Sequence, residues 1–171
     1  MQSVLFATAE AAPVARVGGL AEAAAGLIRS LRTTTGIALT VVLPDYGGVL
    51  LEDEVITALD LPDWVGPATL RTGIAPELGE VQLVGFPAMS RPHPYVDALG
   101  EGWVDNDLRF FGFSAAIAAL AKQIEPDVVH LNDWHTAFAL AWLETPTVYT
   151  CLLYTSPSPR DQRGSRMPSS A

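Results

Sequence analysis

Paired glycines lie beside a permanent cation near the start of the chain, where Arg16 and Val17 precede Gly18 and Gly19. The pair follows a short apolar run and opens a stretch with helical periodicity, so the backbone there can approach a ligand and aim N–H groups at it. A neighbouring guanidinium suits a phosphate or diphosphate. Spacing alone leaves an equal alternative, in which the glycines only allow tight packing at a helix entry. The stretch has neither the Gly-x-Gly-x-x-Gly fingerprint nor the Lys-Ser/Thr of a P-loop.

Two histidines, His130 and His135, flank Asp133 at the end of the apolar run 126–131. They do not predict a zinc site, because histidines five positions apart do not share a helical face and no third strong ligand is nearby. His130 lies within the apolar run, and we expect it to be a core histidine. His135 lies just past the run, where a side chain can reach a ligand crevice and hydrogen-bond a substrate hydroxyl.

Three further polar positions are candidates for a binding site. Glu10 is a lone carboxylate in a loop of small apolar residues, which offers few structural reasons for a charge. Tyr95 lies in a polar loop at 90–95, and long loops inside a compact domain are often functional. Asp105 precedes a helical pattern, and from the residues alone the simpler interpretation is a solvated helix start with Asp105 or Asn106 as the cap.

Alternating strand and helix patterns position these residues. Strands are predicted at 3–8, 38–43, 68–72, 81–86, 126–131 and 147–150. Helices are predicted from about 20 to 31, from 106 to before Pro126, and after Asp133. The alternation predicts an α/β fold: a Rossmann-like, open and mostly parallel sheet with helices on both faces. Its ligand crevice is expected outside the carboxyl ends of the strands.

Helical spacing also predicts which helix faces are buried. In the first helix the apolar face consists of Leu20, Ala23, Ala24, Leu27 and Leu31. In the second helix it consists of Leu108, Phe111, Ala115 and Ala118. The third helix carries Phe138, Leu140, Ala141 and Trp142. We expect Trp134 and Trp142 to be packing aromatics.

The 171 residues carry a formal net charge of −9, and 17% of them are charged. The length predicts one α/β domain, and the negative charge argues against nucleic acid or an anionic membrane surface as a partner. No run approaches the roughly 18 to 20 apolar residues of a membrane helix. The start lacks the basic segment of a secretory signal and Cys151 is the only cysteine, so we expect a cytoplasmic protein.

The chain changes character after Thr150. Residues 151–171 include five serines, three prolines and three arginines, and show neither helical nor strand periodicity. We therefore divide the chain into a domain at 1–150 and a disordered tail at 151–171.

Taken together, three motifs resemble the opening of the bacterial glycogen synthases and plant starch synthases. They are residues 4–20, with Glu10 and the paired glycines; residues 105–110, Asp-Asn-Asp-Leu-Arg-Phe; and residues 126–137, with Asp-Trp-His at 133–135. Their order and spacing also agree, so the resemblance covers residues 1–150. It implies the N-terminal half of a GT-B glycosyltransferase, in which two Rossmann-like domains face each other across a cleft.

The resemblance implies transfer of glucose from ADP-glucose to the non-reducing end of an α-1,4-glucan such as glycogen, with retention and without a metal or other cofactor. It places His135 and Asp133 at the catalytic centre, with His135 on the transferred glucose. It implies nucleotide-sugar contacts from Arg16, Gly18 and Gly19, and acceptor contacts from Glu10, Asp105 and Tyr95. Arg16 stands where the family carries lysine, which keeps the charge but not the geometry of the contact.

The resemblance further implies that the family's C-terminal domain, which supplies most donor contacts, is missing from this chain. We therefore expect the 171 residues alone to be inactive. The tail from Cys151 resembles translated adapter or vector sequence and is expected to be an artefact. Two alternatives remain. One is a non-catalytic, single-domain binder of a nucleotide or glycan; the other is a different two-domain transferase, such as a sucrose synthase relative, which the residues from Glu10 to Leu20 disfavour.

Overall fold

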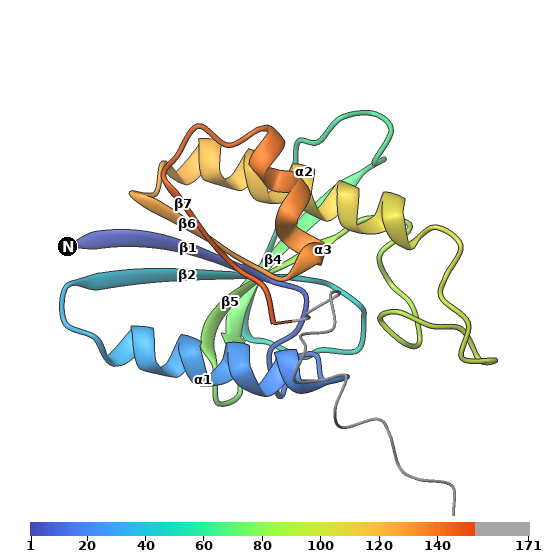
Figure 1. The fold of residues 1–171 in the computed structure, drawn as a ribbon, viewed down its shortest axis with the longest axis horizontal. Helices are drawn as coiled ribbons and strands as arrows, with labels where there is room; N and C mark the ends of the chain where they lie inside the picture. Colours follow the sequence, from blue (N-terminus) through green and yellow to red (C-terminus); the bar gives the residue numbers. More distant parts are fainter. Residues whose placement is uncertain (153–171) are drawn as a thin grey trace, which may run out of the picture.

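The computed structural model describes residues 1–152, so the expectation for the tail concerns residues that, apart from Cys151 and Leu152, lie outside the described range. The strands are β1 (Gln2–Thr8), β2 (Ile37–Pro44), β3 (Glu52–Leu59), β4 (Ala68–Ala75), β5 (Gly79–Gly85), β6 (Val128–Asn132) and β7 (Thr147–Thr150). The helices are α1 (Gly19–Thr33), α2 (Asn106–Ile124), α3 (Trp134–Ala137) and the 3₁₀ helix η1 (Phe138–Ala141). In Figure 1, α1 covers one face of the sheet, and α2 and α3 cover the other.

The seven strands form one sheet in the order β3-β4-β5-β2-β1-β6-β7. The pairs β5–β2, β2–β1, β1–β6 and β6–β7 are parallel, whereas β3–β4 and β4–β5 are antiparallel. The prediction of an open, mostly parallel sheet with helices on both faces is therefore confirmed. The chain leaves β1 toward β2 on one side and returns to β6 on the other, so the strand order reverses at β1, where ligands bind in open α/β sheets.

Each predicted strand is present, but β3 was missed. It begins with Glu52-Asp53-Glu54, and every residue except Leu59 is exposed. An exposed strand at the sheet edge shows no alternation of buried and exposed residues, which is the signal that sequence reasoning depends on. Pairing with β4 holds it in place instead.

Two apolar cores lie on opposite faces of the sheet because successive strand residues point to opposite sides. Phe6, Val41 and Leu43 pack with Ile28 of α1 in one core. Leu5, Ala7, Val42, Phe113 and Ile117 contribute to the other core, which contains α2. The predicted face of α1 is slightly rotated: the buried positions are Leu20, Ala21, Ala24, Ala25 and Ile28, and Ala23 is exposed.

The predicted face of α2 was largely wrong, because only Ala115 of its four residues is buried. Leu108 is exposed and Phe111 is only half buried, whereas the fully buried large side chains of α2 are Arg109, Phe110, Phe113, Ile117 and Leu120. The helix is apolar around most of its circumference, so its spacing does not single out one face. The segment after Asp133 forms only α3 and η1, on which Phe138, Leu140 and Trp142 remain partly exposed.

Candidate functional site

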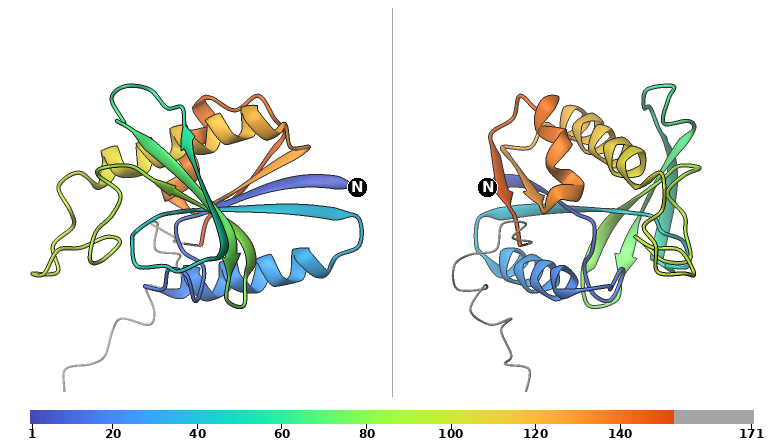
Figure 2. Two further views of the ribbon diagram at one scale, coloured as in Figure 1. Left: turned by 180° about the vertical axis from the view of Figure 1, so that it is seen from behind. Right: turned by 45° about the vertical axis from the view of Figure 1, so that its right-hand side comes forward.

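A hollow of about 520 Å³ lies at the carboxyl ends of β1 and β6. Its lining comes from four segments that are far apart in the sequence: the loop after β1 with the start of α1, the loop before α2, the turn after β6 with the start of α3, and the residues just after β7. The residues are Glu10, Val17, Gly18, Gly19, Leu20, Ala23, Tyr95, Asp133, Trp134, His135 and Leu152. Figure 2 shows the long loop between β5 and α2 extending at this end of the molecule. The hollow thus lies where the fold predicts a ligand crevice.

Glu10 is buried and ties two of these segments together. Its Oε2 accepts hydrogen bonds from the backbone N–H groups of Val17 (2.8 Å) and Gly18 (2.9 Å), and its Oε1 accepts one from the Tyr95 hydroxyl (2.6 Å). The carboxylate therefore has a structural role that its sequence context did not reveal. It also occupies the Gly18 N–H, one of the groups that were expected to face a diphosphate.

The paired glycines are not required by packing within the described chain. A Cβ added at Gly18 or Gly19 would meet nothing within 4 Å. Gly18 has φ −140°, a conformation that any residue adopts. The packing interpretation of the pair is therefore contradicted. Open space in front of two glycines leaves the backbone accessible to a ligand or to another part of the protein.

His135 is 3% exposed and lies in an aromatic enclosure. Its ring centroid is 4.9 Å from that of Tyr95, with the rings stacked, and 4.7 Å from that of Phe110, with the rings edge to face. Burial lowers the pKa of His135 to about 3, so the imidazole is neutral at pH 7. Its Nδ1 is buried and has no hydrogen-bond partner within residues 1–152. A neutral ring with an unused nitrogen suits a sugar hydroxyl rather than a phosphate.

Asp133 is fully buried and has an unusual backbone conformation, φ 63° and ψ 173°. It caps α3: its Oδ1 accepts a hydrogen bond from the Trp134 N–H at 2.8 Å. The Cys151 thiol also donates to Oδ1, over 3.7 Å. The other oxygen, Oδ2, is buried and has no partner in the described part of the chain. Strained backbone and an unsatisfied carboxylate oxygen at one residue are features of functional sites.

Tyr95 connects Glu10 and His135, because its hydroxyl donates to the carboxylate and its ring stacks on the imidazole. Burial raises the pKa of Tyr95 above its ordinary value, so the hydroxyl remains a donor at neutral pH. The structure thus brings together six of the eight predicted site positions in one lining: Glu10, Gly18, Gly19, Tyr95, Asp133 and His135.

Arg16 and Asp105 do not line this hollow. Arg16 pairs with Glu22 (3.1 Å) and lines a second hollow of about 710 Å³ that it shares with Pro13, Arg29 and Glu77. Asp105 occupies the N-cap position of α2 but makes no side-chain cap; its carboxylate pairs with Arg91 instead (2.8 Å). Their nucleotide-sugar and acceptor roles stay predictions.

His130 is half buried, as expected for a core histidine. Its Nε2 lies 2.9 Å from the Thr150 hydroxyl, and its ring contacts Phe6 edge to face. Within residues 1–152, no cluster of three or more His, Cys, Asp or Glu side chains could hold a metal ion. None of the described helices is long and apolar enough to span a membrane.

Sequence reasoning missed Arg109, which lies behind the hollow and is completely buried on α2. The sequence indicated it only as part of a helix start and of the family motif at residues 105–110, with no role of its own. The available signal was a lone arginine followed at once by apolar residues, since a cation among Phe110, Phe111 and Phe113 is costly to bury without a specific purpose.

Comparison with known proteins supports one family for this arrangement. Residues 3–155 match the family model described as starch synthase catalytic domain. A glycogen synthase of Ralstonia nicotianae is 40% identical over 146 residues, which cover 79% of this chain and 26% of that protein. A glycogen synthase of Cellvibrio japonicus is 34% identical over 167 residues, which cover 91% of this chain and 34% of that protein. The chain thus spans between about a quarter and a third of the length of these relatives.

Among solved structures, the chain is similar to the catalytic domain of starch synthase IV from Arabidopsis thaliana bound to ADP and acarbose. The TM-score is 0.66 at 28% sequence identity, covering 88% of this chain and 33% of that one. The family match, the relatives and the GT-B structural neighbour agree with one another. The chain therefore belongs to the starch synthase catalytic domain family, the glycosyltransferases that include the bacterial glycogen synthases.

Proposed function

We propose that residues 1–150 form one wall of the cleft of a synthase that transfers glucose from ADP-glucose to the non-reducing end of an α-1,4-glucan, with retention. In this proposal the hollow beside β1 and β6 holds glucosyl units. His135 contacts the transferred glucose, and Glu10 and Tyr95 lie toward the glucan acceptor. The ADP and acarbose in the Arabidopsis neighbour support this substrate pair.

One observation carries the proposal: Asp133 and His135 line the same hollow, and each has a buried polar atom, Oδ2 and Nδ1, that has no partner within residues 1–152. Leaving such atoms unpaired costs about 1 to 3 kcal/mol each. Sugar hydroxyls can donate to the carboxylate oxygen and can either donate to or accept from the imidazole nitrogen. A glucosyl unit therefore satisfies both atoms at once.

The lining of the hollow accounts for the need for a second domain. None of the described residues that line it is Lys or Arg, and it contains the acids Glu10 and Asp133. A departing diphosphate must be stabilised by cations or by aligned N–H groups. Those cations must come from outside this hollow, and we propose that a C-terminal Rossmann-like domain supplies them. No step in this account requires a metal ion.

Isothermal titration of the chain with maltohexaose and with ADP-glucose tests the binding proposal. We expect maltohexaose to bind with a Kd of about 1 mM, worth about 4 kcal/mol, and ADP-glucose to bind no more tightly. Micromolar binding of ADP-glucose by this chain would instead support a single-domain nucleotide binder. Cellohexaose is the matched control, because it presents the same hydroxyls on a β-linked chain.

Transfer itself is tested with radiolabelled ADP-glucose and glycogen. We expect the parent protein, with its second domain, to incorporate label into glycogen, and the 171-residue chain to incorporate none. Absence of incorporation by an intact parent would contradict the proposed reaction. Elongation by the chain alone would contradict the proposed need for a second domain.

A further inference from the structure

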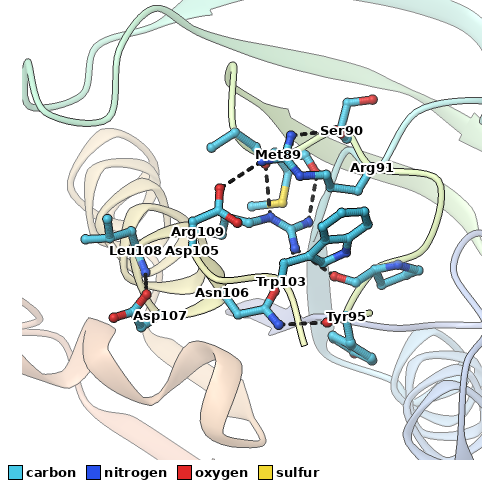
Figure 3. A network of polar contacts seen from close by, with 12 residues as sticks. Met89, Ser90, Arg91, Tyr95, Trp103, Asp105, Asn106, Asp107, Leu108 and Arg109 are labelled. Atoms are coloured by element: carbon cyan, nitrogen blue, oxygen red, sulfur yellow. Dashed lines mark hydrogen bonds and ion pairs between the residues drawn. The ribbon is translucent and has the colours of Figure 1, made fainter. Parts of the chain in front are cut away.

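Arg109 lies at the centre of a polar network that includes the loop carrying Tyr95 (Figure 3). Its Nε donates to the Ala88 carbonyl (3.0 Å), and one terminal nitrogen donates to the Met89 carbonyl (2.9 Å). The other terminal nitrogen donates to the Pro94 carbonyl (2.9 Å) and to Asn106 Oδ1 (2.7 Å). All of these acceptors are uncharged. The planar guanidinium thus holds three carbonyls of one loop in fixed positions.

Asn106 extends the network to the backbone of Tyr95. Its Nδ2 donates to the Tyr95 carbonyl (2.7 Å), which also accepts a hydrogen bond from the Trp103 N–H (3.2 Å). The carbonyls of Pro94 and Tyr95 are therefore both anchored to α2 or to the loop just before it. Figure 3 shows Asn106 reaching from the start of α2 toward Tyr95. The two peptide groups that flank Tyr95 are therefore both held by hydrogen bonds, which leaves the residue little freedom to rotate.

Tyr95, the anchored residue, contacts both Glu10 after β1 and His135 after β6. The Tyr95 hydroxyl holds Glu10, and Glu10 holds the N–H groups of Val17 and Gly18. The Tyr95 ring stacks on His135. Side chains that contact a ligand stay precise only when surrounding hydrogen bonds fix them.

We propose that Arg109, assisted by Asn106, is the positioning residue of the hollow: its guanidinium fixes the loop that carries Tyr95, and Tyr95 in turn fixes Glu10, the glycine loop and the His135 ring. The network accounts for a buried charge that has no carboxylate in direct contact, which the fold alone does not require. The inference does not depend on which ligand the hollow takes. It can therefore fail while the proposed function stands, and the reverse also holds.

The chain offers a matched control in Arg71 on β4. Arg71 also anchors a loop, through the Val49 carbonyl (2.8 Å), Asp45 (2.9 Å) and Glu54 (2.6 Å), but none of these partners lines the hollow. Replacing either arginine with lysine keeps the charge and removes the planar fork. The two substitutions release different loops, and they also differ in the charge of the acceptors that remain: carboxylates around Arg71, and carbonyls and an amide around Arg109.

The test is an NMR comparison of Arg109→Lys, Arg71→Lys and the unaltered chain. In Arg109→Lys we expect the Val17 and Gly18 amides to exchange at least about tenfold faster relative to the β1 amides, and the Tyr95–His135 ring contact to disappear. In Arg71→Lys both should stay as in the unaltered chain. Unchanged exchange and ring contacts in Arg109→Lys, or equal changes in both variants, would overturn the proposal.

Two milder variants keep the proposal testable if Arg109→Lys does not fold. Asn106→Ala keeps Arg109 but removes one of its acceptors, and it leaves the Tyr95 carbonyl bonded to the Trp103 N–H alone, so we expect both faster exchange at Val17 and Gly18 and a weaker ring contact. Tyr95→Phe removes only the hydroxyl, so the two amides should exchange faster while the contact with the His135 ring persists. The proposal fails if Asn106→Ala changes neither readout, or if Tyr95→Phe leaves amide exchange unchanged.

Discussion

Arg71 on β4 and Arg109 on α2 both hold a loop against the sheet, but they do so among different charges. Arg71 contacts the carboxylates of Asp45 and Glu54, and its hydrogen bond to Glu54 raises the pKa of its guanidinium. Arg109 contacts only carbonyls and an amide, and burial lowers its pKa. At the antiparallel end of the sheet, charges are matched locally. On α2, the buried charge of Arg109 instead holds the backbone carbonyls of the loop that carries Tyr95.

Glycines at the antiparallel end of the sheet and at the hollow also differ, in how much space surrounds them. A Cβ at Gly73 on β4 would lie 2.8 Å from the Glu52 carbonyl oxygen, whereas a Cβ at Gly19 would meet nothing within 4 Å. The antiparallel end thus uses its special residues for its own packing. The hollow keeps glycines and polar atoms that the described chain leaves unused. The two atoms of the hollow's lining residues that are unpaired within the described chain, Asp133 Oδ2 and His135 Nδ1, belong to the residues that we expect a ligand to contact.

The largest expected effect follows from Gly73→Ala. The new methyl group would collide with the backbone of β3 rather than with a flexible side chain. We expect a loss of about 2 to 3 kcal/mol in the free energy of unfolding, as for overpacked interiors, measured by urea denaturation. A loss below about 0.5 kcal/mol would show that β3 yields easily and would weaken the contrast between the two ends.

The second effect concerns pH and His135. The pKa of His135 is about 3 in the folded chain and about 6.5 when unfolded, so the unfolded state binds more protons between these values. The contribution of His135 to the free energy of unfolding is therefore complete above pH 6.5, and it decreases as the pH falls from 6.5 toward 3. From pH 7 to pH 5 the loss is about 2 kcal/mol.

His135→Gln should remove that loss, which appears as a smaller drop in urea midpoint between pH 7 and pH 5 than in the unaltered chain. Comparing the two chains cancels contributions from other titrating groups, including His130, whose pKa burial also lowers. Identical pH slopes in both chains would contradict a buried, neutral His135.

A smaller effect is expected at Asp133, whose φ of 63° and ψ of 173° suit glycine. Asp133→Gly and Asp133→Ala both lose the cap on α3, but only glycine relieves the backbone strain. We expect Asp133→Gly to be more stable than Asp133→Ala by about 1 kcal/mol after the entropy cost of glycine. Equal stability of the two variants, measured by thermal unfolding, would mean that the residue is not strained.

The smallest effect is a gain. Gly19 begins α1 and has open space around it, so Gly19→Ala should raise the free energy of unfolding by about 0.5 kcal/mol. The same substitution should weaken maltohexaose binding if the ligand approaches this backbone. A variant that is more stable and binds equally well would remove the glycine loop from the binding site.

The sequence predicted the architecture well where it contains clear apolar runs. The strands around Leu5, Val42 and Val129 are buried on both sides and read as continuous apolar runs, so they and their parallel pairing were predictable. β3 and the buried face of α2 were not. The first is exposed along nearly its whole length, and the second belongs to a helix that is apolar on most sides.

The sequence indicated six residues that the structure brings to one hollow, but it did not indicate the contacts between them. Glu10, Tyr95 and His135 stand out by type and position, and the structure brings them together. That Glu10 holds the glycine-loop amides, and that Tyr95 is anchored by α2, depends on contacts between residues 7 to 85 positions apart. Local sequence patterns do not encode such contacts, which follow only from the packed fold.

Titration of the isotope-labelled chain with maltohexaose tests the central claim most directly, because it locates the ligand. We expect progressive shifts of the His135 and Tyr95 ring signals and of the Gly19 amide, with little change around Arg71 and with cellohexaose as the control. Ring signals of His135 and Tyr95 that stay fixed at saturating maltohexaose, or shifts confined to other surfaces, would contradict the assignment of this hollow to glucosyl units.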